Sequence, residues 1–538
     1  MAHWDVSKLP LRRESLFGNR VVNCRADRPR SVFTMFASAV ARAPDREALV
    51  AGAVRLTWTE LDSIVAEVAA GLLARGVSRG DRVALVIGNR AEFVILLYAL
   101  TRIGAIAVPI SVREQAPGIA FVASHCGARL LIHEQIHSDR IPPAHDLPDV
   151  TGCIVLDEPF NGVLLSSLRT TDIVPPTEVG EEEINLILYT SGTTGKPKGA
   201  MIAHVNLVQA VMIYEHVMGL RDGERSIVAV PMTHVTGISC AIILMARCAG
   251  TLIVMPEFKA PAFLALASAE RMTQTVLVPA MYALCLARAD FSGHDLSAWR
   301  IGAYGGAPMP APVIEGLNAA LPRLNLLNFY GSTETVAAQA IMPPEYALER
   351  RLDVGLPSPG GEILVMDPDG REVPRGTSGE LWLRNGSVVP GYWNDPEASA
   401  ENIVAGFWRS GDLGLMDADG FVRVLDRIKD MINRGGYKIY TAEVESVLAE
   451  HPAVLESAVV AKPCSVLGER VHAFVALRGG AIEAAELADF CATRLADYKR
   501  PETFTIMIDP LPRNANGKLL KREMRKMLLE GQAAIADG

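Results

Sequence analysis

Residues 189–199 read Y-T-S-G-T-T-G-K-P-K-G and directly follow the apolar run 184–188. The stretch combines glycines that let a ligand approach the backbone, hydroxyl side chains, and two lysines, Lys196 and Lys198. A strand followed by such a loop presents backbone N–H groups and cations at the strand end. This combination predicts a binding site for a polyphosphate.

The stretch differs from the P-loop pattern G-x-x-x-x-G-K-[ST]. Only two residues separate Gly192 from Gly195, and Pro197 stands where a magnesium-binding hydroxyl should follow Lys196. The sequence therefore disfavours an ordinary P-loop NTPase. A flexible surface turn is the plain alternative, but flexibility alone does not require this density of lysines and hydroxyls.

Composition indicates a globular chain with two or more domains. At 538 residues, 49% hydrophobic and 21% charged, the chain is too long for one ordinary core. A net charge of -9 argues against nucleic acid as the main partner. The eight cysteines include no C-x-x-C pair, which favours reduced thiols over a zinc site or a disulfide framework.

The sequence shows no targeting or membrane segment. Residues 1–10 lack the apolar core of a secretion signal. The longest apolar stretches, 93–111 and 238–255, are interrupted by arginine and glycine and each reads as a helix followed by a buried strand. We expect a cytoplasmic protein without an integral membrane segment.

The order of patterns predicts an α/β fold. Residues 1–30 carry many arginines without periodicity and read as an arm lying on the body. After Ser31, helices alternate with short apolar strands, which indicates parallel sheets built from βαβ units; the strands are expected at 82–87, 105–110, 128–132 and 153–156. Apolar residues between Leu207 and Met218 recur at helical spacing, so we expect strand, loop and amphipathic helix in succession around the glycine-rich stretch.

Further strands are expected to end at one site. They cover 226–230, 275–278 and 324–329, and each runs into a loop. In open α/β sheets, ligands bind outside the carboxyl ends of the strands. Loops that are distant in sequence are therefore expected to share one cleft.

The pattern changes near Arg409. A hairpin with its turn at Asp419-Gly420 precedes a small α+β unit, whose first helix is expected to be capped by Thr441 and to run to His451. The unit continues with strands at 457–461, 471–477 and 503–508 and a helix at 485–495. We place the boundary near 426–429, which gives domains 1–428 and 429–538.

Several stretches, taken in order, resemble the adenylate-forming superfamily, which contains acyl- and aryl-CoA synthetases, adenylation domains of peptide synthetases and beetle luciferases. They are the glycine-rich loop, P-M-T-H at 231–234, G-G-A-P at 305–308, Y-G-S-T-E at 330–334, S-G-D at 410–412 and P-R-N-A-N-G-K at 512–518. The resemblance covers about residues 30 to 520. It implies a large N-terminal adenylation domain, with parallel βαβ subdomains and a β-rich subdomain, and a small mobile α+β C-terminal domain.

The resemblance assigns an ATP site and a magnesium site. The residues expected to hold ATP or AMP are Thr190, Ser191, Gly192, Thr193, Thr194, Lys198, Gly305, Gly306, Ala307, Tyr330, Gly331, Ser332, Thr333, Asp412 and Arg427. Among these, the tyrosine ring would pack on adenine, the carboxylate of Asp412 would accept bonds from the ribose hydroxyls, and Arg427 would be a second ribose and phosphate contact. Glu334 would bind Mg²⁺ as a hard oxygen ligand.

The resemblance also assigns the reacting groups. Lys518 would bridge the carboxylate and the α-phosphate, and His234 would lie beside the acyl carboxylate, although Thr233 replaces the aromatic residue common in relatives. Lys429 would be the hinge of the mobile domain, and Gly436 of R-G-G-Y-K-I would border the tunnel for the pantetheine arm of CoA.

The acyl pocket is expected from His234, Val235, Tyr304, Gly305, Gly306, Phe329, Val336 and Ala337. Two of these side chains, Tyr304 and Phe329, are bulky, so we expect a small to medium aryl or acyl acid of apolar character. No arginine or lysine is identifiable for a second carboxylate, which disfavours dicarboxylates.

The expected activity is that of an AMP-forming acid–thiol ligase that uses ATP, Mg²⁺ and CoA. An adenylation enzyme that loads a carrier protein would share these motifs. The alternative from another functional class is a catalytically inactive regulator that binds a nucleotide or an acyl ligand. A luciferase-like monooxygenase has no positive support. Only about 20 residues follow Lys518, too few for a carrier domain, so CoA is the preferred acceptor. A homodimer is left open.

Overall fold

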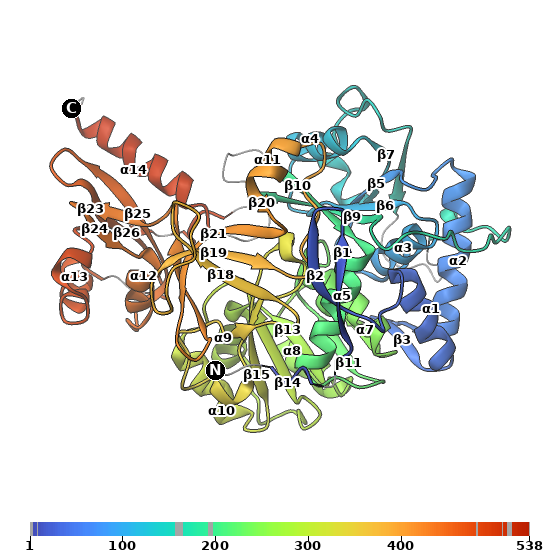
Figure 1. The fold of residues 1–538 in the computed structure, drawn as a ribbon, viewed down its shortest axis with the longest axis horizontal. Coiled ribbons are helices and arrows are strands. Elements are labelled where there is room, and N and C mark those ends of the chain that lie inside the picture. Colours follow the sequence, from blue (N-terminus) through green and yellow to red (C-terminus); the bar gives the residue numbers. More distant parts are fainter. Residues whose placement is uncertain are drawn as a thin grey trace. The chain divides into compact units, whose positions relative to one another are not determined.

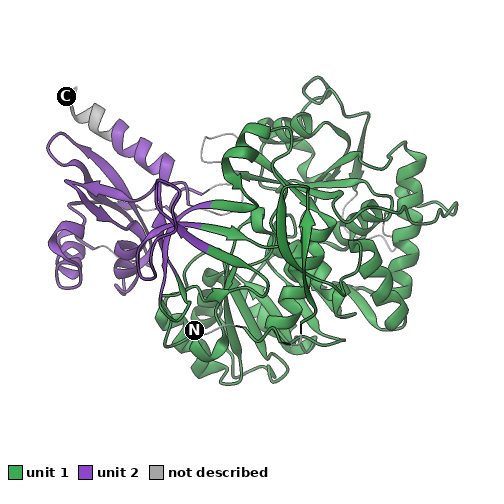
Figure 2. Ribbon diagram, viewed as in Figure 1, with its two compact units in different colours: residues 1–363, 382–409, 418–422 green, residues 364–381, 410–417, 423–538 purple. Residues whose placement is uncertain are grey.

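The computed structural model describes residues 4–7, 9–156, 165–191, 197–479, 482–507, 509–513 and 519–536. The chain divides into two units (Figure 2): unit 1 holds residues 1–363, 382–409 and 418–422, and unit 2 holds 364–381, 410–417 and 423–538. The chain passes between the units within β18 (Glu362–Met366), β19 (Gly379–Arg384), β21 (Phe407–Met416) and β22 (Val422–Arg427). The domain boundary between residues 428 and 429 stays a prediction.

The first sheet of unit 1 carries the strand that enters the glycine-rich stretch. Its order is β10 (Pro197–Ala203), β9 (Ile184–Ser191), β6 (Ile106–Pro109), β5 (Arg82–Val86), β7 (Ala128–Glu134) and β8 (Gly152–Leu156). The strands β9, β6, β5, β7 and β8 run parallel, and β10 is antiparallel to β9. The predicted strands of this sheet and their parallel pairing are confirmed.

The second sheet of unit 1 holds the strands that end at the predicted ligand loops. Its order is β17 (Leu356–Pro357), β16 (Ala340–Ile341), β15 (Asn325–Tyr330), β14 (Ile301–Gly305), β13 (Gln274–Leu277), β11 (Arg225–Val228), β12 (Thr251–Val254), β3 (Glu47–Ala51) and β4 (Val54–Thr57). Strands β11 to β15 and β3 are parallel, whereas β4, β16 and β17 pair antiparallel at the two edges.

A helical layer between the two sheets forms the main core. It contains α1 (Val32–Arg42), α2 (Trp58–Ala74), α3 (Ala91–Arg102), α5 (His204–Val217), the π-helix η4 (Ile238–Ile243) and α7 (Leu244–Arg247). Alternate residues of β5 show the layering, because Val83 and Leu85 join this core while Ala84 and Val86 face the core under α4 (Ala116–Cys126). The helices α8 (Ala260–Ala269), α9 (Pro279–Arg288) and α10 (Ala311–Ala320) cover the other face of the second sheet (Figure 1).

The remaining short elements of unit 1 lie in connections. They are α6 (Val235–Gly237), α11 (Pro396–Asn402), η1 (Gln135–Arg140), η2 (Ala144–Asp146), η3 (Ser166–Leu168), η5 (Thr333–Thr335) and η6 (Pro344–Tyr346). The short strand β20 (Ile403–Val404) instead pairs antiparallel with β21 at the edge of the sheet β18-β19-β21-β20. Both long apolar stretches form a helix followed by a buried strand, as predicted. Within the described ranges, no helix is long and apolar enough to cross a membrane.

Two predictions around unit 1 need correction. Residues 1–30 lie on the body but contain a hairpin, β1 (Leu11–Leu16) and β2 (Arg20–Arg25), whose buried Leu16 and Val22 pack on Val205. The helix α5 is not amphipathic: it is buried along its length except at Glu215 and His216. A helix between two sheets has no face toward water, so its apolar residues need not keep to one stripe.

Unit 2 is the expected small α+β unit. Its sheet has the order β24 (Tyr437–Ile439), β23 (Ile432–Arg434), β26 (Gly468–Leu477) and β25 (Val454–Cys464), and β27 (Thr503–Met507) pairs parallel with β26. The helices α12 (Thr441–Ala449) and α13 (Ala484–Ala492) pack on one face and α14 (Lys521–Ala536) on the other, with η7 (Asp497–Lys499) in a connection. Thr441 is not the N-cap of α12; Tyr440 is, and the Thr441 hydroxyl instead donates to Asp426 at 3.0 Å.

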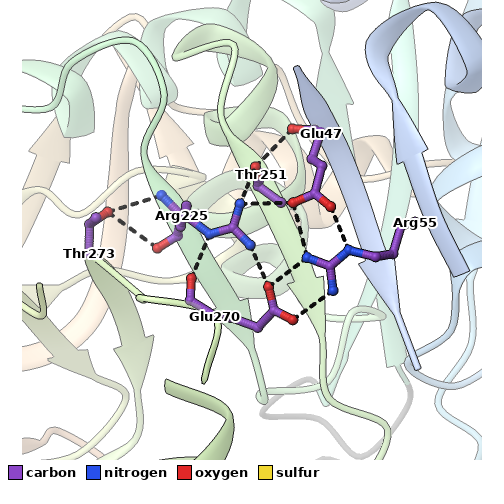
Figure 3. Close-up of polar contacts among 6 residues, drawn as sticks. All are labelled: Glu47, Arg55, Arg225, Thr251, Glu270 and Thr273. Atoms are coloured by element: carbon purple, nitrogen blue, oxygen red, sulfur yellow. Dashed lines mark hydrogen bonds and ion pairs between the residues drawn. The ribbon is translucent and has the colours of Figure 1, made fainter. Parts of the chain in front are cut away.

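A network of charges holds the starting ends of the second sheet's strands (Figure 3). The carboxylate of Glu270 contacts both Arg55, at 2.8 Å, and Arg225, and Glu47 contacts the same two arginines at 2.5 and 3.0 Å. The hydroxyls of Thr251 and Thr273 complete the network at the first residues of β12 and before β13. It lies at the strand starts, whereas the predicted ligand loops follow the strand ends.

Candidate active site

The glycine-rich stretch connects two strands of a β-hairpin. Thr190 on β9 is paired with Lys198 on β10, and Ser191 with Pro197. The predicted succession of strand, loop and helix is therefore wrong, because β10 intervenes before α5. Gly192, Thr193 and Thr194 lie outside the described residues, and so does the side chain of Ser191.

A buried carboxylate, Glu334, gathers hydroxyl groups from three segments. It lies on η5 immediately after β15 and is 6% exposed. Its Oε1 accepts hydrogen bonds from Thr190 Oγ1 at 3.3 Å and from the Tyr392 hydroxyl at 3.1 Å, and its Oε2 accepts from Ser332 Oγ. The structure thus brings the glycine-rich hairpin and the Y-G-S-T-E segment together, as the sequence predicted.

The donor set around Glu334 fits magnesium better than a transition metal. Within the described ranges, no group of three or more His, Cys, Asp and Glu side chains could hold an ion. Mg²⁺ prefers oxygen ligands and is commonly held by one or two carboxylates together with substrate phosphates and waters. A single carboxylate that accepts a hydrogen bond from Thr190, at the start of the stretch predicted to bind a polyphosphate, meets that requirement.

Tyr392 belongs to this cluster and was not predicted. Its ring lies under the Lys198 ammonium, with Nζ 5.3 Å from the ring centroid, while its hydroxyl donates to Glu334. The segment G-Y-W at 391–393 lies along β10, because Met201 N donates to Gly391 O and Trp393 N donates to Gly199 O. The run G-Y-W was the signal in the sequence that could have indicated this residue. Its partners Lys198 and Glu334 are distant in the sequence, so no local pattern pointed to the contact.

The loop after β15 forms an apolar wall. Phe329, Val336 and Ala337 are buried in the main core, and Val235 packs against the same cluster. The ring of Tyr214 on α5 stacks on Phe329 with centroids 5.0 Å apart, and its hydroxyl accepts from Ala338 N at 2.9 Å. Tyr214 is a second residue that the sequence analysis missed.

Val336 adopts a φ of +57°, which is costly for a β-branched residue. Its carbonyl accepts from Ser239 Oγ at 3.5 Å, and the same hydroxyl donates to Val235 O at 2.7 Å. The strained loop is therefore tied to the helix that follows His234.

Tyr304 is not brought together with the other predicted pocket residues. On β14, Ala303 faces the main core, whereas Tyr304 faces the opposite side of the sheet and packs with Tyr282 and Met309. The cause is the alternation of side chains along a strand, which separates Tyr304 from Phe329 even though the two strands are neighbours.

The predicted G-G-A-P turn follows β14. Gly305 is paired with Phe329, and an added Cβ there would lie 2.5 Å from the carbonyl oxygen of Phe329. Gly306 has a φ of +81°, and Gly306 and Ala307 are exposed.

The turn that carries His234 is held by a side chain from another connection. Asn89, between β5 and α3, accepts a hydrogen bond from Met232 N at 2.8 Å and donates to Val230 O at 2.9 Å. His234 itself precedes α6, and its carbonyl accepts from Ile238 N at 3.0 Å. An added Cβ at Gly237 would lie 2.5 Å from Pro231 O, so the turn and the helix fit only with glycine.

Unit 2 contains the predicted ribose-binding pair. Asp412 is 4% exposed, and its Oδ1 lies 2.6 Å from Arg427 Nε. Arg427 also donates to Ser410 O at 3.2 Å, and Ser410 Oγ accepts from Asp412 N at 2.9 Å. The two residues predicted to touch the nucleotide therefore meet across β21 and β22.

The other predicted residues of unit 2 lie on turns and loops. Lys429 follows β22, and its carbonyl accepts from Arg525 at 3.4 Å. Gly436 forms a two-residue turn with Gly435, with φ of +93° and +58°, and this suits a type I′ hairpin. Lys518 lies outside the described residues.

The start of α14 is anchored by a polar cluster. Lys521 Nζ lies 2.7 Å from Glu445 Oε1 and donates to Thr441 Oγ1 at 2.7 Å. Burial raises the pKa of both Asp426 and Glu445 above their ordinary values, and the Lys521 ammonium opposes both shifts. The cluster joins the end of β22 to the helix that follows residues 514–518.

Comparison with known proteins yields two family matches. A model described as "AMP-binding enzyme" matches residues 36–393, and one described as "AMP-binding enzyme C-terminal domain" matches residues 443–518. The chain is 35% identical over 486 residues to a feruloyl-CoA synthase of Amycolatopsis sp., covering 90% of this chain and 96% of that protein. It is 32% identical over 482 residues to the long-chain-fatty-acid–CoA ligase FadD13 of Mycobacterium tuberculosis, covering 88% and 93%.

Among solved structures, the chain resembles the o-succinylbenzoate coenzyme A synthetase of Bacillus subtilis in complex with ATP and magnesium ion. The TM-score is 0.82 with 28% sequence identity, over 91% of this chain and 99% of that one.

Proposed function

The chain belongs to the AMP-binding enzyme family and is an AMP-forming acid–CoA ligase, and we propose that its acid is a small to medium aryl or acyl carboxylate of apolar character. The observation that supports this acid class is the buried stack of Tyr214 on Phe329 beside Val336 and Ala337. Such a wall offers apolar contact and no cation for a second carboxylate. The relatives are named as a feruloyl-CoA synthase and a long-chain-fatty-acid–CoA ligase, so the names of relatives do not by themselves select one kind of acid.

The reaction has two steps. A carboxylate oxygen of the acid attacks the α-phosphorus of ATP, the bond to pyrophosphate breaks, and an acyl-AMP forms. The CoA thiol, losing its proton, then attacks the acyl carbon, and the bond between that carbon and the AMP oxygen breaks. The protein needs no covalent nucleophile, since positioning and electrostatic stabilisation account for both steps.

Unit 1 is proposed to hold the phosphates and the metal. Thr190 and Lys198, on paired strands, would contact the phosphates, and Glu334 would hold Mg²⁺. Magnesium, when bound, would offset the charge of the polyphosphate oxygens. His234, on a turn fixed by Asn89, would lie beside the acid's carboxylate.

The remaining nucleotide contacts of unit 1 are proposed from the resemblance. Tyr330 would pack on adenine and Thr333 would contact the α-phosphate, while the exposed G-G-A-P turn would line the adenine site.

Unit 2 is proposed to hold the ribose and to supply the mobile parts. The Asp412 carboxylate, already oriented by Arg427, would accept bonds from the ribose hydroxyls. Lys518 would bridge the two anions in the first step, Lys429 would be the hinge, and the open turn at Gly436 would admit the pantetheine arm in the second step.

Two further features remain part of the proposal. The cysteines are all free, which suits a reducing compartment such as the cytoplasm. A carrier-protein acceptor in place of CoA, and a homodimer, are the alternatives that solution experiments would detect.

The test is pyrophosphate release with Mg-ATP across short, medium, long and aromatic acids, with and without CoA. We expect release with apolar aromatic or medium-chain acids, and steady formation of thioester and AMP once CoA is added. A charged dicarboxylate as the best substrate would overturn the acid class, and release that CoA does not accelerate would indicate a carrier protein.

A pair of variants tests the pocket wall itself. Phe329→Gly is expected to extend activity to longer acids, because its side chain is part of the main core beside the loop of Val336. Leu326→Ala is the matched control, since it opens a buried space on the same strand but on the opposite face. Equal acid preference in both variants would contradict the placement of the pocket.

A further inference from the structure

Tyr392 connects the two charged groups that unit 1 is proposed to place on ATP. One face of its ring lies below the Lys198 ammonium at 5.3 Å, a cation–π distance, and its hydroxyl donates to Glu334 Oε1 at 3.1 Å. The residue is 5% exposed. A single rigid side chain thus touches both the cation and the carboxylate.

The position of Tyr392 is fixed by the hairpin that carries the phosphate loop. Gly391 and Trp393 bond to β10 on either side of it, and Tyr392 N donates to Ser399 Oγ at 2.8 Å. Ser399 Oγ in turn donates to Asp395 O at 2.7 Å at the start of α11. These bonds fix the backbone of Tyr392 beside β10, so the ring starts from a defined position next to Lys198.

The chemistry of the contact favours a donor role. The Tyr392 hydroxyl carries one O–H group, and its oxygen lies 3.1 Å from Glu334 Oε1, a carboxylate oxygen that can only accept. A buried carboxylate needs hydrogen-bond partners, and Tyr392 shares the role of donor to Glu334 with Thr190 and Ser332.

We infer that Tyr392 is a positioning residue for the metal carboxylate: its hydroxyl orients Glu334 toward the cation of Mg-ATP, and its ring holds Lys198 beside the same phosphates. The inference rests on the proposed role of Glu334 as the magnesium ligand. Tyr392 acts through Glu334 and Lys198 and itself touches no reacting atom.

The experiment uses the full chain and measures equilibrium binding of Mn²⁺-ATP by the electron paramagnetic resonance signal of Mn²⁺, in the absence of acid. Tyr392→Phe keeps the ring and removes only the hydroxyl. Because a hydrogen bond to a charged group carries more weight than a neutral one, we expect affinity for Mn²⁺-ATP to fall ~10-fold while binding of ATP in EDTA stays unchanged. Tyr282→Phe, which removes a buried hydroxyl donor to Ala303 O, is the matched control and should bind as wild type.

The Glu334→Gln background separates the possible failures. If Glu334→Gln binds Mn²⁺-ATP as tightly as wild type, the metal assignment itself is wrong. If Glu334→Gln weakens binding but Tyr392→Phe does not, or if Tyr392→Phe weakens ATP binding equally without metal, the positioning role is refuted. In the double variant, Tyr392→Phe should add no further loss, and a full additive loss would also overturn the inference.

Discussion

Gly237→Ala tests whether the His234 turn is held by close backbone packing. The added Cβ would lie 2.5 Å from Pro231 O and 2.7 Å from Met232 Cα, whereas comfortable separations are about 3.5 Å or more. Both contacts are with backbone, so the strain cannot be relieved by rotating a side chain. Either the helix α6 or the turn at Pro231–His234 must move.

The expected cost follows from this overlap of about 1 Å. Overpacking of a well-packed interior typically costs ~1–3 kcal/mol, and we expect about 2 kcal/mol of unfolding free energy to be lost. Part of the strain will displace the turn, which Asn89 holds at Met232 N. The KM for the acid is therefore expected to rise about tenfold, whereas ATP binding, which depends on other loops, should change little.

Denaturant unfolding and acid-dependent pyrophosphate release measure the two effects. Gly180→Ala is the control, because its Cβ would meet only the end of the Glu183 side chain at 3.3 Å in an exposed loop. If Gly237→Ala matches Gly180→Ala in both stability and KM, the turn is not constrained as the structure indicates. A loss of stability without any change in KM would show that His234 does not depend on this packing.

Three further predictions concern charge. Glu270→Gln should lower the unfolding free energy by ~1–2 kcal/mol, because Glu270 is largely buried and contacts two arginines. The loss should shrink in 1 M salt, and an unchanged denaturation midpoint would show that the charge network of Figure 3 does not stabilise the fold. Burial lowers the pKa of His472 from 6.5 to about 4, so on acidification the unfolded chain binds a proton before the folded chain does. The unfolding free energy should therefore fall by up to ~3 kcal/mol as pH drops from 6.5 to about 4. An imidazole NMR signal of His472, assigned with His472→Gln, that titrates near 6.5 would contradict this. Arg427→Ala and Asp412→Asn should each weaken AMP binding, measured by calorimetry, by about tenfold. In the double variant the two losses of binding free energy should not add, and a fully additive loss would show that the pair does not act together.

The sequence predicted those elements whose signal is local. Apolar runs bounded by turn residues predicted the strands β5 to β8, β11, β12, β13 and β15, because buried parallel strands need continuous apolar sequence. Strand β14 was not predicted. Strand β10 was missed because its start, P-K-G, carries no strand signal and its pairing with β9 comes from the hairpin. The hairpin β1–β2 was missed because three consecutive charged residues interrupt L-R-R-E-S-L, so the segment shows no alternation of apolar and polar residues.

Only those residues of the candidate site that belong to a recognisable sequence motif could be predicted. Glu334 follows strand β15 as predicted, whereas Asp412 lies within β21 and Arg427 ends β22. The hydroxyls of Thr190 and Tyr392, which orient Glu334, come from distant segments. Tyr392 is 58 residues from Glu334 in the sequence, and no local pattern connects the two. Tyr304 shows the reverse case, since strand alternation turns it away from the pocket despite its neighbouring position.

The central claim is that the acid is activated as an acyl-adenylate and then transferred to CoA. The most direct measurement uses an acid from the substrate panel with both carboxylate oxygens labelled with ¹⁸O, followed by mass spectrometry of the nucleotide products after turnover with ATP, Mg²⁺ and CoA. One labelled oxygen must appear in AMP, because the oxygen that attacks the α-phosphorus leaves with AMP when the thiol cleaves the acyl bond. Label in inorganic phosphate together with ADP, or unlabelled AMP, would contradict the account.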